Sequence, residues 1–195
     1  MKSAVFINIL SLLFCGTFAS AEWREQVSNH RGNVKVSPLG LLIGYYNIDL
    51  DFAMDDHWAL GPTLSYYSWN FGLNSSSFKA TSYAVGARGS WFSHGVYQDG
   101  LYISPILSYV GASVSGTSGT TSASGSASAV SVSGLVGYHW FWDTFNMNLG
   151  VGYSAILGNV QVTATASDGS TYSSNVSTSN ASGGLALDFM MGILF

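Results

Sequence analysis

The sequence predicts an all-β fold: a transmembrane up-and-down antiparallel β-barrel of about eight strands, with short periplasmic turns and longer extracellular loops. The prediction depends on composition, on alternating polarity and on connections of alternating length. Charged residues make up 8% of the 195 residues, hydrophobic residues 47% and aromatic residues 14%. Ordinary globular proteins carry about 25% charged residues. The chain has too little charge for a soluble surface and too many apolar residues for disorder, so lipid is the solvent that fits it.

The first residues predict an exported protein. Lys2 supplies a positive start, Ala4–Phe14 forms an apolar run, and Ala19-Ser20-Ala21 is a small-x-small cleavage site. The apolar run is too short for a transmembrane helix, which needs roughly 20 residues, and no later stretch comes closer. We therefore expect a signal peptide at 1–21, a short periplasmic segment at 22–33 and the barrel at 34–195.

The single cysteine, Cys15, lies within this leader. The exported chain is therefore expected to hold no disulfide and no cysteine-based metal site. Residues 12–16 loosely resemble a lipobox, but Phe14 stands where that signal has a small residue. Cleavage as an ordinary signal peptide is the favoured interpretation.

From Val34 onward, apolar and polar residues alternate with the period of two that is typical of strands. Ile48 and Phe52, for example, alternate with Asp49 and Asp51. In a membrane barrel the apolar face meets lipid and the polar face lines the lumen. We expect a first hairpin of strands 34–43 and 46–54, which gives eight strands in all; a single strand over 39–54 would give seven. An even number places both termini on the periplasmic side.

The connections alternate between short and long. Short ones are expected near 55–57, 94–100 and 143–144, and longer ones near residue 74, at 113–128 and at 163–182. The two longest segments consist mainly of Ser, Thr, Gly and Ala, a composition that cannot bury enough apolar area to fold alone. They are predicted to be mobile extracellular loops.

One charged set falls on the predicted lumen face. It comprises Asp49, Asp51, Arg88 and Asp188, with His139 on the same face. Because unpaired charges inside a membrane are costly, we interpret the set as a salt-bridge network that plugs the barrel, with a gated ion or proton path as the alternative. His139 could titrate near neutral pH, but a lone lumen histidine is more often a hydrogen-bonding filler.

A group of aromatic residues lies at the strand ends next to the short turns, where an aromatic girdle meets the headgroups. It comprises Trp58, Trp91, Trp140, Trp142 and Phe145.

No catalytic, metal or cofactor site is predicted. The chain has no G-x-S-x-G elbow and no phosphate-binding loop, and the histidines lack metal-ligand spacing. The net charge of −4 without a basic cluster argues against nucleic-acid binding.

The C-terminal segment carries the most specific motif. Its alternating residues Phe189, Met191, Ile193 and terminal Phe195 look like the signal that the barrel-assembly machinery recognises. Together with Val36–Gly40 and the strands that follow, this segment resembles the small bacterial outer-membrane β-barrels of the OmpA, OmpX and OmpW types. The resemblance implies a Gram-negative outer-membrane location, outer-membrane lipid as surroundings, the assembly machinery as a partner and a monomeric state.

The resemblance does not transfer an activity, because the family contains anchors, adhesins, narrow channels and lipid enzymes. We expect a structural or surface-display role with a filled or very narrow lumen, and no enzyme activity. The alternatives are a narrow OmpW-like channel for small or hydrophobic solutes, and adhesion through the Ser/Thr/Gly-rich loops.

Overall fold

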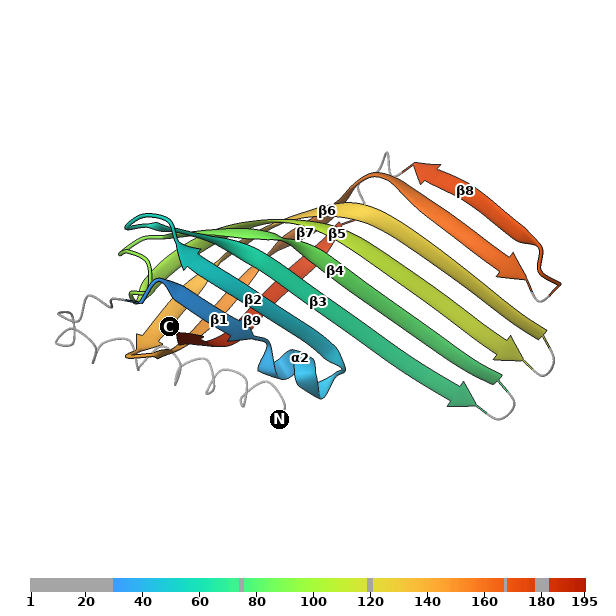
Figure 1. Ribbon diagram of the computed structural model, residues 1–195, viewed down its shortest axis with the longest axis horizontal. Coiled ribbons are helices and arrows are strands. Elements are labelled where there is room, and N and C mark those ends of the chain that lie inside the picture. Colours follow the sequence, from blue (N-terminus) through green and yellow to red (C-terminus); the bar gives the residue numbers. More distant parts are fainter. Residues whose placement is uncertain (1–29, 74–75, 119–120, 167, 178–182) are drawn as a thin grey trace, which may run out of the picture.

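The computed structural model describes residues 30–73, 76–118, 121–166, 168–177 and 183–195, and nearly all of them lie in β-strands (Figure 1). The elements are β1 (Gly32–Val36), α2 (Pro38–Leu42), β2 (Tyr45–Ala53), β3 (Trp58–Leu73), β4 (Ser76–Phe92), β5 (Gly100–Ser118), β6 (Thr121–Trp142), β7 (Phe145–Ala166), β8 (Thr171–Ser177) and β9 (Gly183–Leu194). No helix in the described part of the chain is long and apolar enough to cross a membrane.

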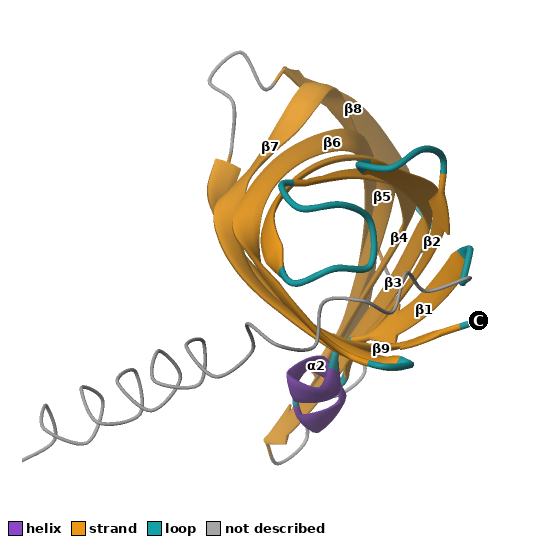
Figure 2. Cartoon of the chain, turned by 90° about the vertical axis from the view of Figure 1, so that its left-hand side faces the viewer, coloured by secondary structure: helices purple, strands orange, loops and turns teal. Residues whose placement is uncertain are grey.

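The strands close into an eight-stranded antiparallel barrel, which confirms the predicted all-β class, barrel closure and strand number (Figure 2). Each strand from β1 to β7 pairs with the next, and β9 pairs with both β7 and β1. β8 and β9 share one place beside β7: β9 pairs with residues 145–155, and β8 pairs with residues 159–165. The pairing of β1 with β9 satisfies the backbone groups that an open sheet would leave unpaired along this part of its two edges.

The barrel has its apolar side chains outside and its polar side chains inside. Ile48 and Phe52 of β2 are exposed, whereas Asp49 and Asp51 between them are each 1% exposed. The same alternation continues around the wall, and among the described residues the buried apolar cluster consists of Ala59, Phe92, Tyr102 and Leu135. This arrangement is the reverse of a soluble sandwich, in which the apolar face points inward.

Two levels of aromatic residues ring the exterior. At the short-turn end, Trp58 pairs with Trp91 and Trp142 with Phe145. Eight residues further along β3, Tyr66 pairs with Tyr46 on one side and with Tyr83 on the other, and Tyr109 and Tyr153 are exposed on β5 and β7. At about 3.3 Å per residue and a tilt of about 40°, the two levels lie roughly 20 Å apart.

The expected first hairpin is wrong in one part. Residues 38–42 form the short helix α2 instead of continuing the strand from Val36. The cause is local: the Ser37 side chain caps the helix by accepting a hydrogen bond from Gly40 N, and Pro38 begins it. Proline has no N–H for a strand ladder but fits the first turn of a helix.

The segments expected as the longest loops are largely strands. Residues 113–118 and 121–128 form the outer part of the β5–β6 hairpin, and residues 163–166 and 171–177 that of the β7–β8 hairpin. Cross-strand hydroxyl pairs occur at this end, such as Thr81–Ser113 at 2.6 Å. Backbone pairing, which composition alone does not reveal, supplies the order here. Residues 178–182 lie outside the described part of the chain.

Candidate functional site: the polar network in the lumen

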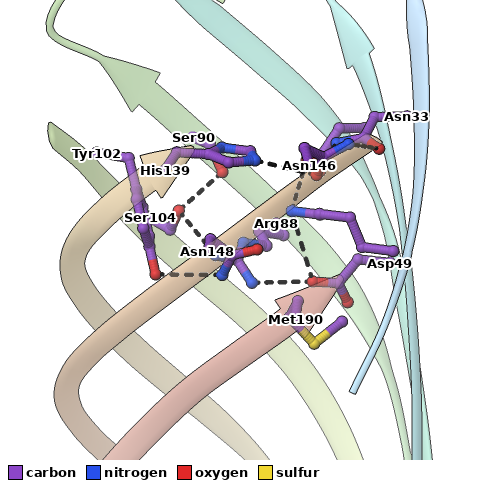
Figure 3. A network of polar contacts seen from close by, with 12 residues as sticks. Asn33, Asp49, Arg88, Ser90, Tyr102, Ser104, His139, Asn146, Asn148 and Met190 are labelled. Carbon is purple, nitrogen blue, oxygen red and sulfur yellow. Dashed lines mark hydrogen bonds and ion pairs between the residues drawn. The ribbon is translucent and has the colours of Figure 1, made fainter. Parts of the chain in front are cut away.

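A cluster of buried charged residues occupies the lumen in the half of the barrel nearer the short turns. We call it the central network: Lys35 from β1, Asp49 and Asp51 from β2, Arg88 from β4 and Asp188 from β9. Figure 3 labels Asp49 and Arg88 of this set, together with neighbouring polar residues. Each of these side chains is at most 5% exposed. The alternation of the strands turns all five inward, so four strands contribute charge to one place.

Arg88 is the centre of the network. Its Nη1 lies 2.9 Å from Asp49 Oδ2, and its Nη2 lies 2.7 Å from Asp188 Oδ2. A further bond of 3.3 Å from Nη1 to Asp188 Oδ1 makes that pair bidentate. The planar guanidinium fork matches a carboxylate in this geometry, which gives direction as well as energy. Arg88 thereby joins β4 to β2 and β9.

Neutral donors complete the surroundings of the Asp188 carboxylate. Tyr102 Oη donates to Asp188 Oδ2 at 2.6 Å, and Asn148 Nδ2 donates to the same oxygen at 2.7 Å. The Tyr102 ring also lies beside the Arg88 guanidinium, with 5.7 Å between the guanidinium carbon and the ring centroid. A buried charge is tolerated only when such partners satisfy it, and Asp188 has three.

Lys35 forms the second cationic point of the network. Its Nζ lies 2.6 Å from Asp51 Oδ2 and 4.0 Å from Asp49 Oδ2, and the Thr63 hydroxyl donates to Asp49. Sequence reasoning did not select Lys35. The signal was present, because Val34 and Val36 flank it on the outward face and strand alternation then turns it inward.

His139 lies nearer the short-turn end in a layer of rings and amides. Its Nε2 is 3.0 Å from Asn146 Oδ1, and Asn146 exchanges two hydrogen bonds with Asn33. The rings of Phe141 and Phe92 pack on the imidazole at 4.1 and 5.6 Å between centroids. His139 is 1% exposed, so these rings and amides enclose the imidazole.

The turn between β4 and β5, residues 93–99, closes the barrel at this end (Figure 2). Tyr97 Oη donates to the carbonyl oxygens of Asp51 and Arg31, and its ring lies 6.0 Å from that of Phe141. The backbone of Tyr97 has φ 62°, a left-handed conformation that costs a non-glycine residue roughly 1–2 kcal/mol. The contacts on both sides of the bore hold the turn in place despite that cost.

These contacts place buried, mutually bonded side chains across the lumen at this level. The network contains three carboxylates and two cations, a formal sum of −1, and each cation contacts at least one carboxylate. In the described ranges no group of three or more potential ligands could hold a metal ion.

The other predicted residues lie on the exterior. Trp58, Trp142 and Phe145 are exposed, whereas Trp91 and Trp140 are half-buried. In β9, Phe189 and Met191 are half-buried and Ile193 is exposed, and Phe195, which follows the strand, is also exposed. The ring of Phe195 packs edge-on against Phe52 with 6.4 Å between centroids.

Fold and network together define a class of protein: a closed eight-stranded antiparallel β-barrel with an apolar exterior and a charged, tightly bonded interior. The sequence profile of the family described as Protein of unknown function (DUF3575) matches residues 8–175, and the chain belongs to this family. Searches of curated proteins and of solved structures found no match.

Proposed function

We propose that this protein is a bacterial outer-membrane β-barrel with a closed lumen, whose role is structural or surface-displaying and not catalytic. The observation that carries the proposal is the inverted distribution of side chains. Large apolar residues such as Leu64, Leu107 and Val136 are about half exposed, whereas the charges are enclosed. Such a wall would be poorly soluble in water and well matched to a bilayer.

The aromatic levels support a membrane position. We call the level that contains Trp58 and Trp142 the tryptophan level and the level that contains Tyr66 and Tyr109 the tyrosine level. These two levels bound an apolar band of roughly 20 Å, comparable with the band of about 25 Å in outer-membrane barrels. In this orientation the short turns and Phe195 face the periplasm. The C-terminal residues are then available to the assembly machinery, as the resemblance to small outer-membrane barrels implies.

The interior supports a closed barrel more than a channel. Arg88 is held by two carboxylates from different strands, and the turn at 93–99 covers the periplasmic end. A narrow OmpW-like channel would require these contacts to break, so we place the structural role first. An eight-stranded barrel has room only for side chains or one small ligand, in keeping with this choice.

The strands beyond the tyrosine level support surface display. β5 continues for nine residues past Tyr109, to Ser118, which is about 30 Å along the strand. Its outer part and that of β6 carry hydroxyl and small side chains with almost no charge. This hairpin would stand above the outer leaflet, where it could contact other molecules at the cell surface.

The experiment combines gel mobility with electrical recording. The protein is extracted from membranes and run with and without boiling, because a closed barrel resists detergent until heat unfolds it. We expect a heat-dependent shift. The same preparation should give no ion conductance in a planar bilayer. If removal of the central cation opens a path through the lumen, the Arg88→Ala variant should conduct. A stable conductance of the unmodified protein would replace the structural role with the channel, and a soluble periplasmic protein without a shift would refute the membrane assignment.

A further inference from the structure

The first strand is too short to complete the barrel wall. β1 pairs with β9 only through Asn33–Val36 opposite Leu194–Met191, and beyond Val36 the chain leaves the sheet as α2. The wall between β2 and β9 therefore has an opening, which we call the lateral opening. It is bounded by residues 45–47 of β2, residues 183–190 of β9 and α2.

The lateral opening lies at the level of the apolar band. Val36 is four residues above the start of β1, about half of the distance between the tryptophan and tyrosine levels. At its upper end, Leu185 of β9 pairs across the sheet with Tyr153 of the tyrosine level. The opening thus spans the half of the band that lies nearer the long hairpins.

The edge of β9 presents polar backbone groups to this opening. Gly32 and Phe195 exchange backbone hydrogen bonds, so alternate residues of β9 before Phe195 direct N–H and C=O toward the β1 side. By this alternation Leu185, Leu187 and Phe189 direct theirs into the opening. In the described part of the chain, no backbone hydrogen bond joins α2 to β9. Each unsatisfied group in lipid costs several kcal/mol, so a polar partner is needed here.

The rim around this polar edge is apolar and unusually exposed. Leu185 and Leu187 are 74% and 78% exposed, compared with 43% and 45% for Leu149 and Val151 on neighbouring β7. The difference arises because no strand covers the β1 side of β9 at this level. Leu42 of α2, which borders the opening, is 82% exposed.

Inside the barrel there is open space beside Gly184 of β9. A Cβ atom added to Gly184, whose side faces the lumen opposite Ser154, would meet no atom within 4 Å. Below it, Asn47 Nδ2 contacts Met190 Sδ at 3.6 Å across the gap between β2 and β9. Asn47 Oδ1 is buried and has no hydrogen-bond partner among the described residues. The floor of the opening therefore offers an acceptor for a hydroxyl or amide group.

Resting on the membrane assignment above, we propose that the lateral opening is a lipid-binding portal: it admits an acyl chain of an amphiphile from the surrounding bilayer into the lumen above the network. The ester, amide or hydroxyl groups of the amphiphile would bond to the β9 edge and Asn47, which pure hydrocarbon could not do. The segment that follows β1 does not continue the wall as a strand, because it folds as α2, which contacts both β2 and β9 at the edge of the opening.

The test uses fluorescence quenching by a phospholipid that carries a nitroxide on its acyl chain. Single cysteines replace Ser154, which faces the lumen, or adjacent Tyr153, which faces outward, in a Cys15→Ser background, and each is labelled with bimane. The full chain is then reconstituted in phosphatidylcholine vesicles containing the nitroxide lipid. We expect quenching at both positions. Gly184→Phe should remove most of the quenching at position 154 and leave that at 153 unchanged.

Gly134→Phe is the matched control. Gly134 also has no atom within 4 Å of an added Cβ and also lies beside Tyr153, but on the outward face. It should leave the lumen label quenched. Heat-dependent gel mobility verifies that each variant folds, and Gly184→Leu replaces Gly184→Phe if the larger residue prevents assembly.

The outcomes separate the two proposals. Absence of quenching at position 153 would overturn the membrane assignment, and the portal with it. Quenching at 153 without quenching at 154 would overturn the portal alone. Equal quenching at 154 in the Gly184 and Gly134 variants would also overturn it, because the lipid would then not enter through the lateral opening.

Discussion

Replacing Arg88 with methionine should be among the most destabilising single changes in this barrel. The substitution keeps most of the side-chain length but removes the bonds to Asp49, Asp188 and Ser104. The buried formal charge changes from two cations and three carboxylates, a sum of −1, to one cation and three carboxylates, a sum of −2. Two carboxylates lose their nearest cation at the same time.

The magnitude can be worked from these contacts. Hydrogen bonds to charged groups contribute about 1.5–3 kcal/mol each. Asp188 retains Tyr102 and Asn148, and Asp49 retains Thr63 and the more distant Lys35, so the loss is smaller than the sum over the broken bonds. Removal of one partner of a buried ion pair costs about 3–5 kcal/mol, and we expect a decrease of that size in the free energy of unfolding.

A double variant tests whether the cost arises from charge. Arg88→Met with Asp188→Asn leaves one cation and two carboxylates, which restores the sum of −1. Since a buried ion pair can be replaced by neutral groups at little cost, the double variant should recover most of the loss. Lys79→Met, at an exposed cation of β4, should change stability by less than about 0.5 kcal/mol.

The measurement is urea-dependent unfolding in vesicles, followed by tryptophan emission and by heat-dependent gel mobility. The reasoning would be refuted by an Arg88→Met protein that unfolds at the same urea concentration as the unmodified protein. It would also be refuted by a double variant no more stable than the single one, because the loss would then come from packing and not from uncompensated charge.

Three further predictions concern the wall, the turn and the C-terminus. Gly61→Ala should destabilise by about 1–3 kcal/mol in urea unfolding, because its Cβ would collide with the Leu50 carbonyl, whereas Gly134→Ala should be tolerated. Tyr97→Phe removes hydroxyl bonds to two main-chain carbonyls and should cost about 1 kcal/mol and speed proteolysis of the turn; unchanged proteolysis would contradict its closing role. Deletion of Phe195 should lower the heat-shifted fraction of newly made protein, and an unchanged fraction would argue against an assembly signal.

The predictable part of the fold follows from alternation and from scarcity of charge. In a strand, side chains at i and i+2 share a face, so the apolar face of β2 places Asp49 and Asp51 together without any knowledge of tertiary structure. With so few charged residues, those on the polar faces of other strands could be selected as a set. Their pairing in space, Arg88 with Asp188 above all, depends on which strands meet across the bore.

The parts that sequence reasoning missed depend on local capping and on long-range contacts. Ser37-Pro38 is a helix-start signal within a segment assigned to a strand, and it could have been found. Tyr102 lies between outward Leu101 and Ile103, so alternation turns this aromatic side chain inward, although aromatic residues were expected mainly on the exterior. The position of Tyr97 could not have been found, because its left-handed backbone is held by contacts with distant strands.

The central network holds the first and last strands of the barrel together, a role for which the buried apolar cluster is too small. The barrel closes where β1 meets β9, and we call this place the seam. β1 and β9 form four residue pairs there, whereas β6 and β7 pair along almost their whole length. The network bonds cross this seam or lie beside it, since Lys35 of β1 binds Asp51 of β2, and Arg88 joins β2 to β9. Asn33 of β1 also exchanges bonds with Asn146 of β7, passing over β9. A barrel that leaves its wall open above β1 therefore concentrates its polar side-chain contacts below the opening, where they hold the first and last strands together.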